Sequence, residues 1–406
     1  MPLTDNIAVS QPSMSTAEVL ERVRRAMRLP PGATVAVAMS GGVDSSCVAG
    51  LLVEAGYQVF GLTARLYDVD LAAARRAGSC CAPEDARDAR EVAQTLGIRH
   101  YAVDEREAFA QNVIEPFAQA WLAGETPNPC VACNQFLKFD RLVEMARDLG
   151  AEALATGHYA RLELRDGRPA LLRGADLAKD QAYFLYPLPA EAADYLRFPL
   201  GELTKPQVRD QAERLGLPTA AKRESMDICF VGAEGTQAWL DKRYGVRSGP
   251  LLDAAGTRLG QHAGVTGFTV GQRQGLGLQP RGPQAEPWYV IDKHGDGSVV
   301  VGQKQQLQVH HLFLDSCLWI SGAAPSQGAQ LAVQIRHRGQ AVACEVKAAS
   351  DDGRKIHLEI TGSLQAAARG QSGVLLQGDQ VLGGGIISQA RGPGELANGN
   401  DGVARG

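Results

Sequence analysis

The sequence predicts an α/β protein that carries a parallel sheet in its N-terminal half and an antiparallel β-barrel at its C-terminal end. Two observations lead to this fold class. Short valine- and alanine-rich runs alternate with helical segments from residue 33 to about residue 155, a pattern typical of a mostly parallel sheet covered on both faces. From about residue 305 the chain instead shows short strand-like segments separated by turns, as in small barrels and sandwiches.

The alternating elements of the first half follow one another in a regular order. We expect strands at 33–39, 57–62, 100–103 and 153–155, and helices at 45–55, 85–96, 109–122 and 139–149. Gly56, Gly97 and Gly150 follow three of these helices, and glycine commonly ends a helix. Pro116 interrupts the helix at 109–122. These segments predict a Rossmann-like sheet domain.

The length of 406 residues is more than one core usually serves, so we expect several domains. The expected parts are a flexible lead at 1–16, a catalytic domain at 17–230, a central domain at 231–304, a barrel at 305–390 and a disordered tail at 391–406. Glycines become frequent and helical spacing disappears after residue 230. The barrel strands are expected at 331–336, 341–348, 355–361 and 373–377.

Composition and charge restrict the location and the partners only loosely. Hydrophobic residues make up 45% and charged residues 21%, which is ordinary for a soluble enzyme. The chain has no run of 18 apolar residues and no basic, then apolar, start, so we expect a cytoplasmic protein without a membrane span. A net charge of −4 argues against an overall basic nucleic-acid binder but allows a local basic surface.

The heptad SGGVDSS at residues 40–46 lies where a strand passes into a helix. Its two glycines allow the backbone to approach an anion closely, and the helix N-terminus offers unpaired N–H groups. Asp44 could hold Mg²⁺ or cap the helix. The alternative is a tight turn without a ligand. Because the chain lacks the G-x-x-x-x-G-K-[ST] pattern here, the loop is not of the Walker type.

Three of the eight cysteines stand out by their position. Cys130 and Cys133 form a C-x-x-C in a stretch rich in proline and asparagine, residues 126–134, which we expect to be a loop. A helix beginning near Phe136 would place Cys133 at its N-terminus, where a thiol pKa is lowered. Cys229 lies in an apolar setting and, taken alone, reads as a core cysteine. The same interpretation applies to Cys47, Cys317, Cys344 and, as structural or incidental residues, to Cys80 and Cys81.

Seven motifs occur in a fixed order: SGGVDSS, TPNPxxxCN, ATGHY, KDQxYFLY, SxxICF, GQRxGLG and LGGGII. With them the chain resembles the bacterial tRNA-specific 2-thiouridylases of the ATP pyrophosphatase superfamily over roughly residues 33–388. The resemblance implies a tRNA-uridine 2-sulfurtransferase. ATP, with Mg²⁺, adenylates the C2 oxygen of the wobble uridine in tRNAs for Lys, Glu and Gln, and a cysteine persulfide then supplies the sulfur.

The resemblance also assigns roles to single residues. Cys229 would carry the persulfide, and Cys133 would be the partner thiol that forms a transient disulfide with it. The ATP-binding positions would be Ala38, Met39, Ser40, Gly41, Gly42, Val43, Asp44, Ser45, Ala64 and Gly157. The tRNA-binding positions would be Asn128, Pro129, Cys130, His158, Lys179, Asp180, Gln181, Arg336, His337 and Gln371. The default for the family is a monomer, and the sulfur donor would be a cysteine desulfurase or a relay protein.

Position 130 departs from the commonest family pattern, which has Asp there. Cys130, Cys133 and Cys229 could therefore hold a 4Fe-4S cluster, or Cys130 could be an alternative resolving thiol; we favour the persulfide route. Two other functions compete. One is an adenylating ligase for a small molecule, which shares the phosphate loop but does not need the two distant cysteines. The other is a non-catalytic tRNA-binding or iron–sulfur scaffold, which the intact SGGVDSS argues against.

Overall fold

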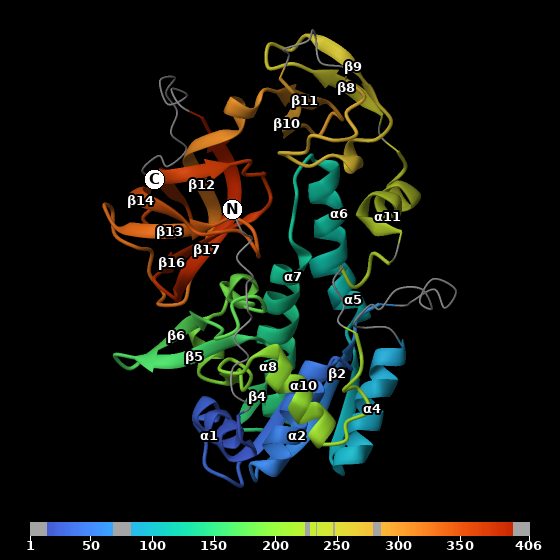
Figure 1. The fold of residues 1–406 in the computed structure, drawn as a ribbon, viewed down its shortest axis with the longest axis vertical. Helices are drawn as coiled ribbons and strands as arrows, with labels where there is room; N and C mark the ends of the chain where they lie inside the picture. Colours follow the sequence, from blue (N-terminus) through green and yellow to red (C-terminus); the bar gives the residue numbers. More distant parts are fainter. Residues whose placement is uncertain are drawn as a thin grey trace, which may run out of the picture.

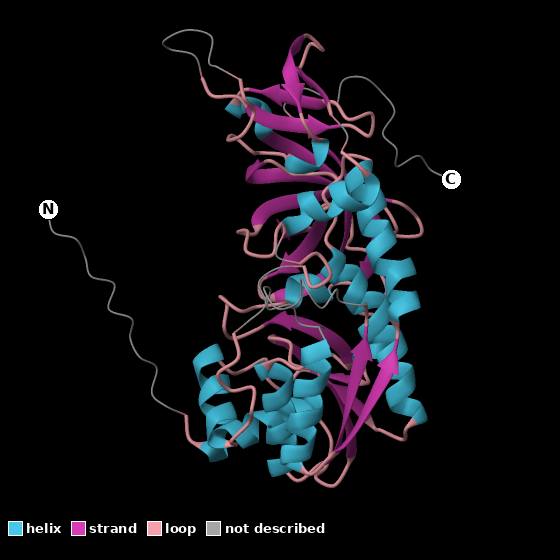
Figure 2. Cartoon of the chain, turned by 90° about the vertical axis from the view of Figure 1, so that its right-hand side faces the viewer, coloured by secondary structure: helices cyan, strands magenta, loops and turns pink. Residues whose placement is uncertain are grey.

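The computed structural model describes residues 14–67, 83–223, 228–232, 234–246, 248–278 and 286–392. Cys80, Cys81, most of the expected lead and nearly all of the expected tail lie outside these residues. An α/β domain forms one end of the elongated molecule, a small β-rich unit forms the other end, and a barrel lies beside the connection between them (Figure 1). Figure 2 shows the same stack from the side, with most helices at the α/β end.

The α/β domain is built on a five-stranded sheet in the order β3-β2-β1-β4-β7. Every pairing in this sheet is parallel, which confirms the expected parallel sheet. The strands are β1 (Thr34–Ala38), β2 (Gln58–Arg65), β3 (Arg99–Asp104), β4 (Ala153–Ala155) and β7 (Leu196–Arg197). The central strand β1 is apolar on both faces, with Val35, Ala36 and Val37 fully buried, because helices cover the sheet on both sides.

One face of the sheet packs on α1 (Thr16–Met27), α2 (Val43–Glu54), α4 (Pro83–Leu96) and α10 (Lys205–Arg214). The other face packs on α8 (Leu142–Asp148). Helix α1 begins with a capping box in which Ser15 and Glu18 satisfy each other's backbone N–H groups. The short elements η3 (Ala182–Leu185) and α9 (Ala190–Ala193) contribute buried residues to the same cluster as α8. The sheet is therefore held between two apolar layers.

Two long helical runs depart from the sequence-based expectation. The first consists of α5 (Arg106–Phe109), the π-helical turn η1 (Ala110–Ile114) and α6 (Glu115–Leu122). Pro116 does not interrupt this run, because the change to π geometry just before it places the proline in the first turn of α6. The second run begins ten residues earlier than expected and consists of α7 (Pro129–Ala132), the π-helix η2 (Cys133–Arg141) and α8.

The C-terminal part is a closed antiparallel barrel. Its strands are β12 (Gln308–Trp319), β13 (Gln330–Gln334), β14 (Val342–Ala349), β15 (Ile356–Gln365), β16 (Ser372–Gln377) and β17 (Gln380–Arg391). They follow the order β12-β15-β14-β13-β16-β17, and pairing of β12 with β17 closes the ring. The hairpin of β5 (Ala160–Arg165) and β6 (Arg168–Arg173) belongs to the α/β part of the chain but pairs with β17. The barrel is thus joined to the α/β domain by sheet hydrogen bonds.

The central unit contains the four-stranded sheet β10-β11-β8-β9. Its elements are β8 (Gly249–Leu252), β9 (Arg258–His262), η4 (Val265–Gly267), β10 (Tyr289–Lys293), β11 (Val299–Gly302) and η5 (Lys304–Leu307). Before it comes α11 (Gly235–Tyr244), so the expectation that helical spacing ends at residue 230 was wrong. Helix α11 packs through Leu240 and Trp239 on the aromatic side chains of α6, and these contacts are long-range ones that local composition does not reveal.

Candidate active site

A cavity of about 610 Å³ opens where the carboxyl ends of β1, β2 and β4 meet the start of α2. In open parallel sheets this edge is the usual place for a ligand. The cavity brings together 17 of the residues predicted from the sequence: Ala38, Met39, Ser40, Gly42, Val43, Asp44, Ser45, Ala64, Pro129, Cys130, Cys133, Gly157, His158, Lys179, Gln181, Cys229 and His337. Residues from seven separate stretches of the chain therefore line one cavity.

The phosphate loop is shaped by its own hydroxyl groups and by two glycines. The Ser40 N–H donates to Ser45 Oγ at 3.1 Å, and Ser46 Oγ donates to the Gly42 carbonyl at 2.8 Å. Gly41 has a φ of +71°, and a Cβ there would lie 2.2 Å from the Asp85 carbonyl oxygen. Only glycine fits this position. The loop continues directly into the first turn of α2, whose backbone N–H groups can bind an anion.

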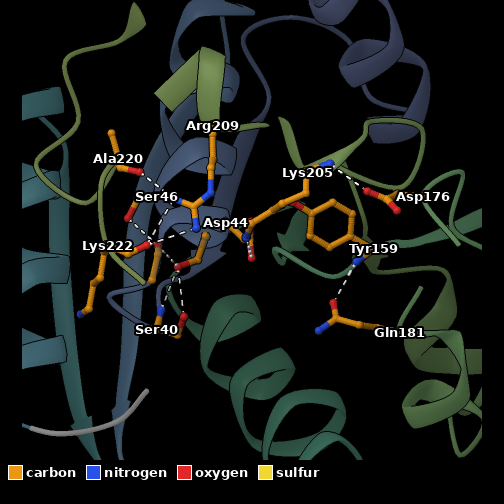
Figure 3. Close-up of polar contacts among 12 residues, drawn as sticks. Ser40, Asp44, Ser46, Tyr159, Asp176, Gln181, Lys205, Arg209, Ala220 and Lys222 are labelled. Carbon is orange, nitrogen blue, oxygen red and sulfur yellow. Dashed lines mark hydrogen bonds and ion pairs between the residues drawn. The ribbon is translucent and has the colours of Figure 1, made fainter. Parts of the chain in front are cut away.

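Asp44 does not cap helix α2, whose N-cap residue is Gly42. Its carboxylate accepts hydrogen bonds from Lys205 Nζ at 2.7 and 2.8 Å and from Tyr159 Oη at 2.8 Å (Figure 3). Lys205 is buried, whereas the Asp44 side chain is 30% exposed, and their ion pair holds α10 against the phosphate loop. The Asp44 carboxylate is thus already bound by protein groups.

Lys222 provides a second cation at the opposite side of the loop. Its Nζ donates to the Gly41 carbonyl at 2.9 Å and lies 2.5 Å from carboxylate oxygens of Asp85 and Asp88. Arg209 of α10 in turn donates to the carbonyl oxygens of Ala220 and Lys222 (Figure 3). The segment that leads toward Cys229 is therefore tied to the phosphate loop, α4 and α10.

Cys133 and Cys229 pack on one apolar cluster formed by Leu66, Phe109, Val113 and Leu137. The Tyr67 hydroxyl donates to the backbone carbonyl of Cys229 at 2.7 Å. The next residue, Phe230, lies edge to face against the rings of Phe109 and Phe117. These contacts fix the segment that carries Cys229 on the cavity wall and surround both sulfur atoms with apolar side chains.

The expected helix start next to Cys133 was wrong. The helical run begins at Pro129, capped by Asn128, whose side chain accepts from the Cys130 N–H at 3.1 Å. Cys133 lies one turn inside the run, at the first residue of the π-helix, while the exposed Cys130 occupies the first turn. The N-terminal end of the helix dipole therefore acts on Cys130 more than on Cys133. Asn128 and proline at the first helical position explain why a loop-like composition begins a helix.

His158 lies in the cavity wall in a neutral state. Its Nδ1 is 2.7 Å from Thr156 Oγ1, and its Nε2 is 3.1 Å from Lys138 Nζ. Burial, with a smaller contribution from the Lys138 charge, holds the pKa of His158 well below its ordinary value. Because an ammonium group can only donate, Nε2 is the acceptor and Nδ1 carries the proton.

A second cavity of about 310 Å³ shares Pro129, Ile228 and His337 with the first one. It is lined by three further predicted residues, Asn128, Arg336 and Gln371. Among the described residues, Gln371 Oε1 and Thr126 Oγ1 are buried without a hydrogen-bond partner, and both side chains line this cavity. Polar groups in this state are suited to binding a polar ligand.

Two predicted residues line neither cavity. Gly41 packs against the backbone of Asp85. The Asp180 carboxylate is buried and accepts from Arg173 Nε and from the N–H groups of Gly174 and Ala182. It therefore orders its own turn, and its backbone carbonyl lies 2.7 Å from His337 Nε2. The side chain of Asp180, a tRNA-binding position by resemblance, is thus already bound by protein groups.

The other three cysteines that the structure describes do not line the cavity. Cys47, Cys317 and Cys344 are buried, and burial raises the pKa of each thiol to about 12, so they are core residues as expected. The part of the chain that the structure describes contains no group of three His, Cys, Asp or Glu side chains arranged to hold a metal ion. Cys130, Cys133 and Cys229 are all described and line the same cavity, but they do not form such a group.

Comparison with known proteins agrees with this site. Family models match the chain at 33–233 (tRNA methyl transferase HUP domain), 237–303 (tRNA methyl transferase PRC-barrel domain) and 309–387 (aminomethyltransferase beta-barrel domain). The tRNA-specific 2-thiouridylase MnmA of Rhodospirillum centenum is 44% identical over 91% of this chain and 95% of its own length. That of Mycobacterium ulcerans is 43% identical over 87% and 97%. The chain belongs to the tRNA-specific 2-thiouridylase family.

The 2-thiouridylase cavity also contains residues that the sequence did not single out. Lys138, Asn134, Lys205, Lys222 and Arg223 all line it. Lys138 and Asn134 follow Cys133 within two helical turns, so the helix itself was the signal that could have found them. Lys205 and Lys222 come from α10 and the segment after it, more than 160 residues from Asp44 in the case of Lys205, and no local pattern marks them.

Proposed function

We propose that this 2-thiouridylase family member thiolates the wobble uridine of tRNAs for Lys, Glu and Gln at C2, at the expense of ATP. The observation that carries the proposal is that the phosphate loop, Cys133 and Cys229 line one cavity. An adenylating ligase for a small molecule would need the loop alone. The adjoining second cavity, with its unsatisfied Gln371 and Thr126 groups, fits a polar substrate that extends beyond the first cavity, as an unstacked RNA base with its neighbours does.

The chemistry follows in two steps. The uridine C2 oxygen attacks the α-phosphorus of ATP, and pyrophosphate leaves from the SGGVDSS loop. The terminal sulfur of a persulfide on Cys229 then bonds to C2 as AMP departs, and the Cys133 thiolate attacks the inner sulfur of Cys229. The Cys133–Cys229 disulfide that results must be reduced by an external thiol. Mg²⁺ would enter with the ATP phosphates, because Lys205 and Tyr159 already bind the Asp44 carboxylate.

The predicted ATP and tRNA residues keep their assigned roles in this proposal, with Asp180 as a positioning residue. The proposal follows the persulfide route, and no step passes through a 4Fe-4S cluster. We further propose a catalytic domain at 17–230, a central domain at 231–304 and a barrel at 305–390, a division close to the matched family models. A cytoplasmic monomer supplied with sulfur by a cysteine desulfurase or a relay protein completes the proposal. Among the described helices, none is long and apolar enough to cross a membrane.

The test measures 2-thiouridine in unmodified tRNA-Glu by nucleoside mass spectrometry, with ATP, Mg²⁺ and a desulfurase plus cysteine. We expect an ATP-dependent product that Cys133→Ser and Cys229→Ser abolish while tRNA binding is retained. Cys130→Ser should keep most of the activity, because Cys130 is exposed and does not belong to the apolar cluster of the other two thiols. AMP formation without thiouridine would favour the small-molecule ligase. If the wild type contains iron, and Cys130→Ser loses both this iron and the activity, the cluster alternative would be favoured.

A further inference from the structure

Asn134 combines deep burial, a fixed amide orientation and an unsatisfied oxygen on the wall of the active-site cavity. The residue is 3% exposed and follows Cys133 directly. Its Nδ2 donates to the backbone carbonyl of Phe184 at 3.0 Å. Its Oδ1 is buried and finds no hydrogen-bond partner among the residues that the structure describes. A buried acceptor left in this state destabilises the site, so a ligand that supplies a donor would be bound more tightly.

The orientation of the amide is set by the protein. Because the Phe184 carbonyl can only accept, the nitrogen of the Asn134 amide must face it, and the oxygen is left for the opposite side. The ring of Phe184 lies 4.3 Å from that of His337, centroid to centroid. His337 lines both cavities, and Asn134 and Phe184 line the larger one. Asn134 therefore belongs to a cavity wall that also offers aromatic rings for base stacking.

We propose that Asn134 Oδ1 accepts a hydrogen bond from the N3–H group of the target uracil and thereby selects uridine over cytidine. The inference rests on the proposed function. Uracil carries its only ring N–H donor at N3, next to the C2 oxygen that reacts. Cytosine has an unprotonated acceptor at N3, which would oppose Asn134 Oδ1 with a second acceptor. A site built to bind a donor rejects an analogue that lacks it, because its own acceptor stays unpaired.

A tRNA-Glu with 3-deazauridine at the wobble position removes the N3–H donor and leaves the C2 and C4 oxygens in place. We expect wild-type protein to bind this tRNA about tenfold more weakly than the uridine form, as the loss of one buried hydrogen bond predicts. Asn134→Ala should bind both tRNAs equally, with an affinity near that of the wild type for the 3-deazauridine form. Such coupling shows that residue and donor interact.

Asn112→Ala is the matched control. Asn112 also donates from Nδ2 to a backbone carbonyl, that of Ala108 at 2.8 Å, but is exposed on the surface of the helical run that contains η1. This variant should discriminate between the two tRNAs as the wild type does. If Asn134→Ala does not fold, the wild-type comparison still decides, because equal binding of both tRNAs overturns the inference.

The adenine amino group of ATP is the other donor that could reach the cavity. A raised KM for ATP in Asn134→Ala, with tenfold discrimination between the two tRNAs retained, would assign Oδ1 to adenine and overturn the inference. Thiouridine formation by the wild type on ordinary tRNA-Glu is measured in parallel. Its presence with equal tRNA binding refutes only the role of Asn134, whereas its absence refutes the proposed function and, with it, this inference.

Discussion

At the scale of single residues, burial controls the protonation of several histidines. His100, His158, His262 and His311 all have a pKa below the ordinary value of 6.5, in each case first because of burial. In the unfolded chain these side chains take up protons as the pH falls through 6.5, whereas in the folded protein they do so only at lower pH. The free energy of unfolding is therefore highest above pH 6.5 and decreases below it.

The first prediction concerns His158, the histidine in the cavity. Its replacement by Gln keeps hydrogen-bonding groups but removes a side chain that binds a proton more readily in the unfolded state than in the folded state. Denaturant unfolding between pH 8 and pH 5.5 should then show a smaller loss of stability on acidification, by up to about 1.4 kcal/mol per pH unit. An unchanged pH dependence would mean that the pKa of His158 is the same in the folded and the unfolded protein.

Residue patterns predicted the components of the site better than their contacts. The sequence places Asp44 at the start of a helix and Asp180 in a surface turn, and both interpretations are local ones. In the structure, Lys205 binds Asp44, and Arg173 binds Asp180. Neither partner could be chosen from the sequence, because Lys205 is 161 residues from Asp44 and Arg173 lies in a strand that precedes the turn with Asp180. Cys133 lines the same cavity as the phosphate loop, but its helix was expected to begin too late, since Asn128 and Pro129 can start a helix as well as form a loop.

At the scale of elements, the close approach of β4 to α2 shapes the ATP side of the cavity. Gly157 follows β4, and a Cβ on it would lie 2.8 Å from the Ser45 nitrogen and 3.0 Å from the Asp44 carbonyl carbon. Both are backbone atoms of the first turn of α2, so they cannot move aside as a flexible side chain would. The glycine thus sets the distance between the strand end and the phosphate loop.

We predict that Gly157→Ala weakens ATP binding at least about tenfold, the equivalent of 1.4 kcal/mol, by displacing the first turn of α2. The affinity is measured by titration with a non-hydrolysable ATP analogue. Gly264→Ala is the control, because a Cβ there meets atoms only at 3.4 Å and beyond. Equal ATP affinity in the two variants would show that the start of α2 can adjust.

A second prediction at this scale concerns the contacts of Lys222 with the phosphate loop and α4. Lys222→Met removes the donor to the Gly41 carbonyl and leaves Asp85, which is 4% exposed, without this cation. We expect a higher KM for ATP and slower thiolation together, because the contact links the loop to the segment leading to Cys229. Lys222→Arg should recover most of both. A change in only one of the two parameters would contradict the link.

At the scale of the whole molecule, three parts of the chain meet directly ahead of the active-site helix. Lys293 of β10 is 1% exposed, lies 4.2 Å from the centre of the Trp121 ring and donates to the Glu125 carbonyl at 3.2 Å. Arg369 of the barrel side donates to the Lys293 carbonyl, and its own carbonyl accepts from the Thr126 N–H at 2.8 Å. The central unit and the barrel are therefore both anchored to the segment after α6.

The prediction for this junction follows from the pKa of Lys293, which burial lowers to about 8 from 10.5. Between pH 8 and 10.5 the unfolded chain holds this proton and the folded protein does not, so stability rises with pH in that window. Lys293→Met should lack this rise, by up to about 1.4 kcal/mol per pH unit relative to the wild type. Parallel stability curves of the two proteins from pH 7.5 to 9.5 would contradict the assignment.

The sequence predicted the parallel sheet and the barrel because each is marked by repeated local patterns. It did not predict that β6 would pair with β17, since a strand pairing between segments more than 200 residues apart depends on the assembled surfaces. The helix α11 was missed for a related reason. Its mean pattern is weakly amphipathic, and its stability comes from the aromatic contact of Trp239 with Phe230.

The segment from Thr126 to Cys133 sets the distance between the junction of the three parts and the cavity. One end is hydrogen-bonded to Arg369 at the junction, and the other end is Cys133 inside the cavity. Between them, Asn128 caps the helix and Pro129 fixes its first turn, so the backbone of this segment has little conformational freedom. One residue more or less in this stretch would rotate the start of the helix by about 100° and turn the thiol away from the cavity. Surface loops of the protein can change length over evolutionary time, whereas this spacing must be inherited unchanged.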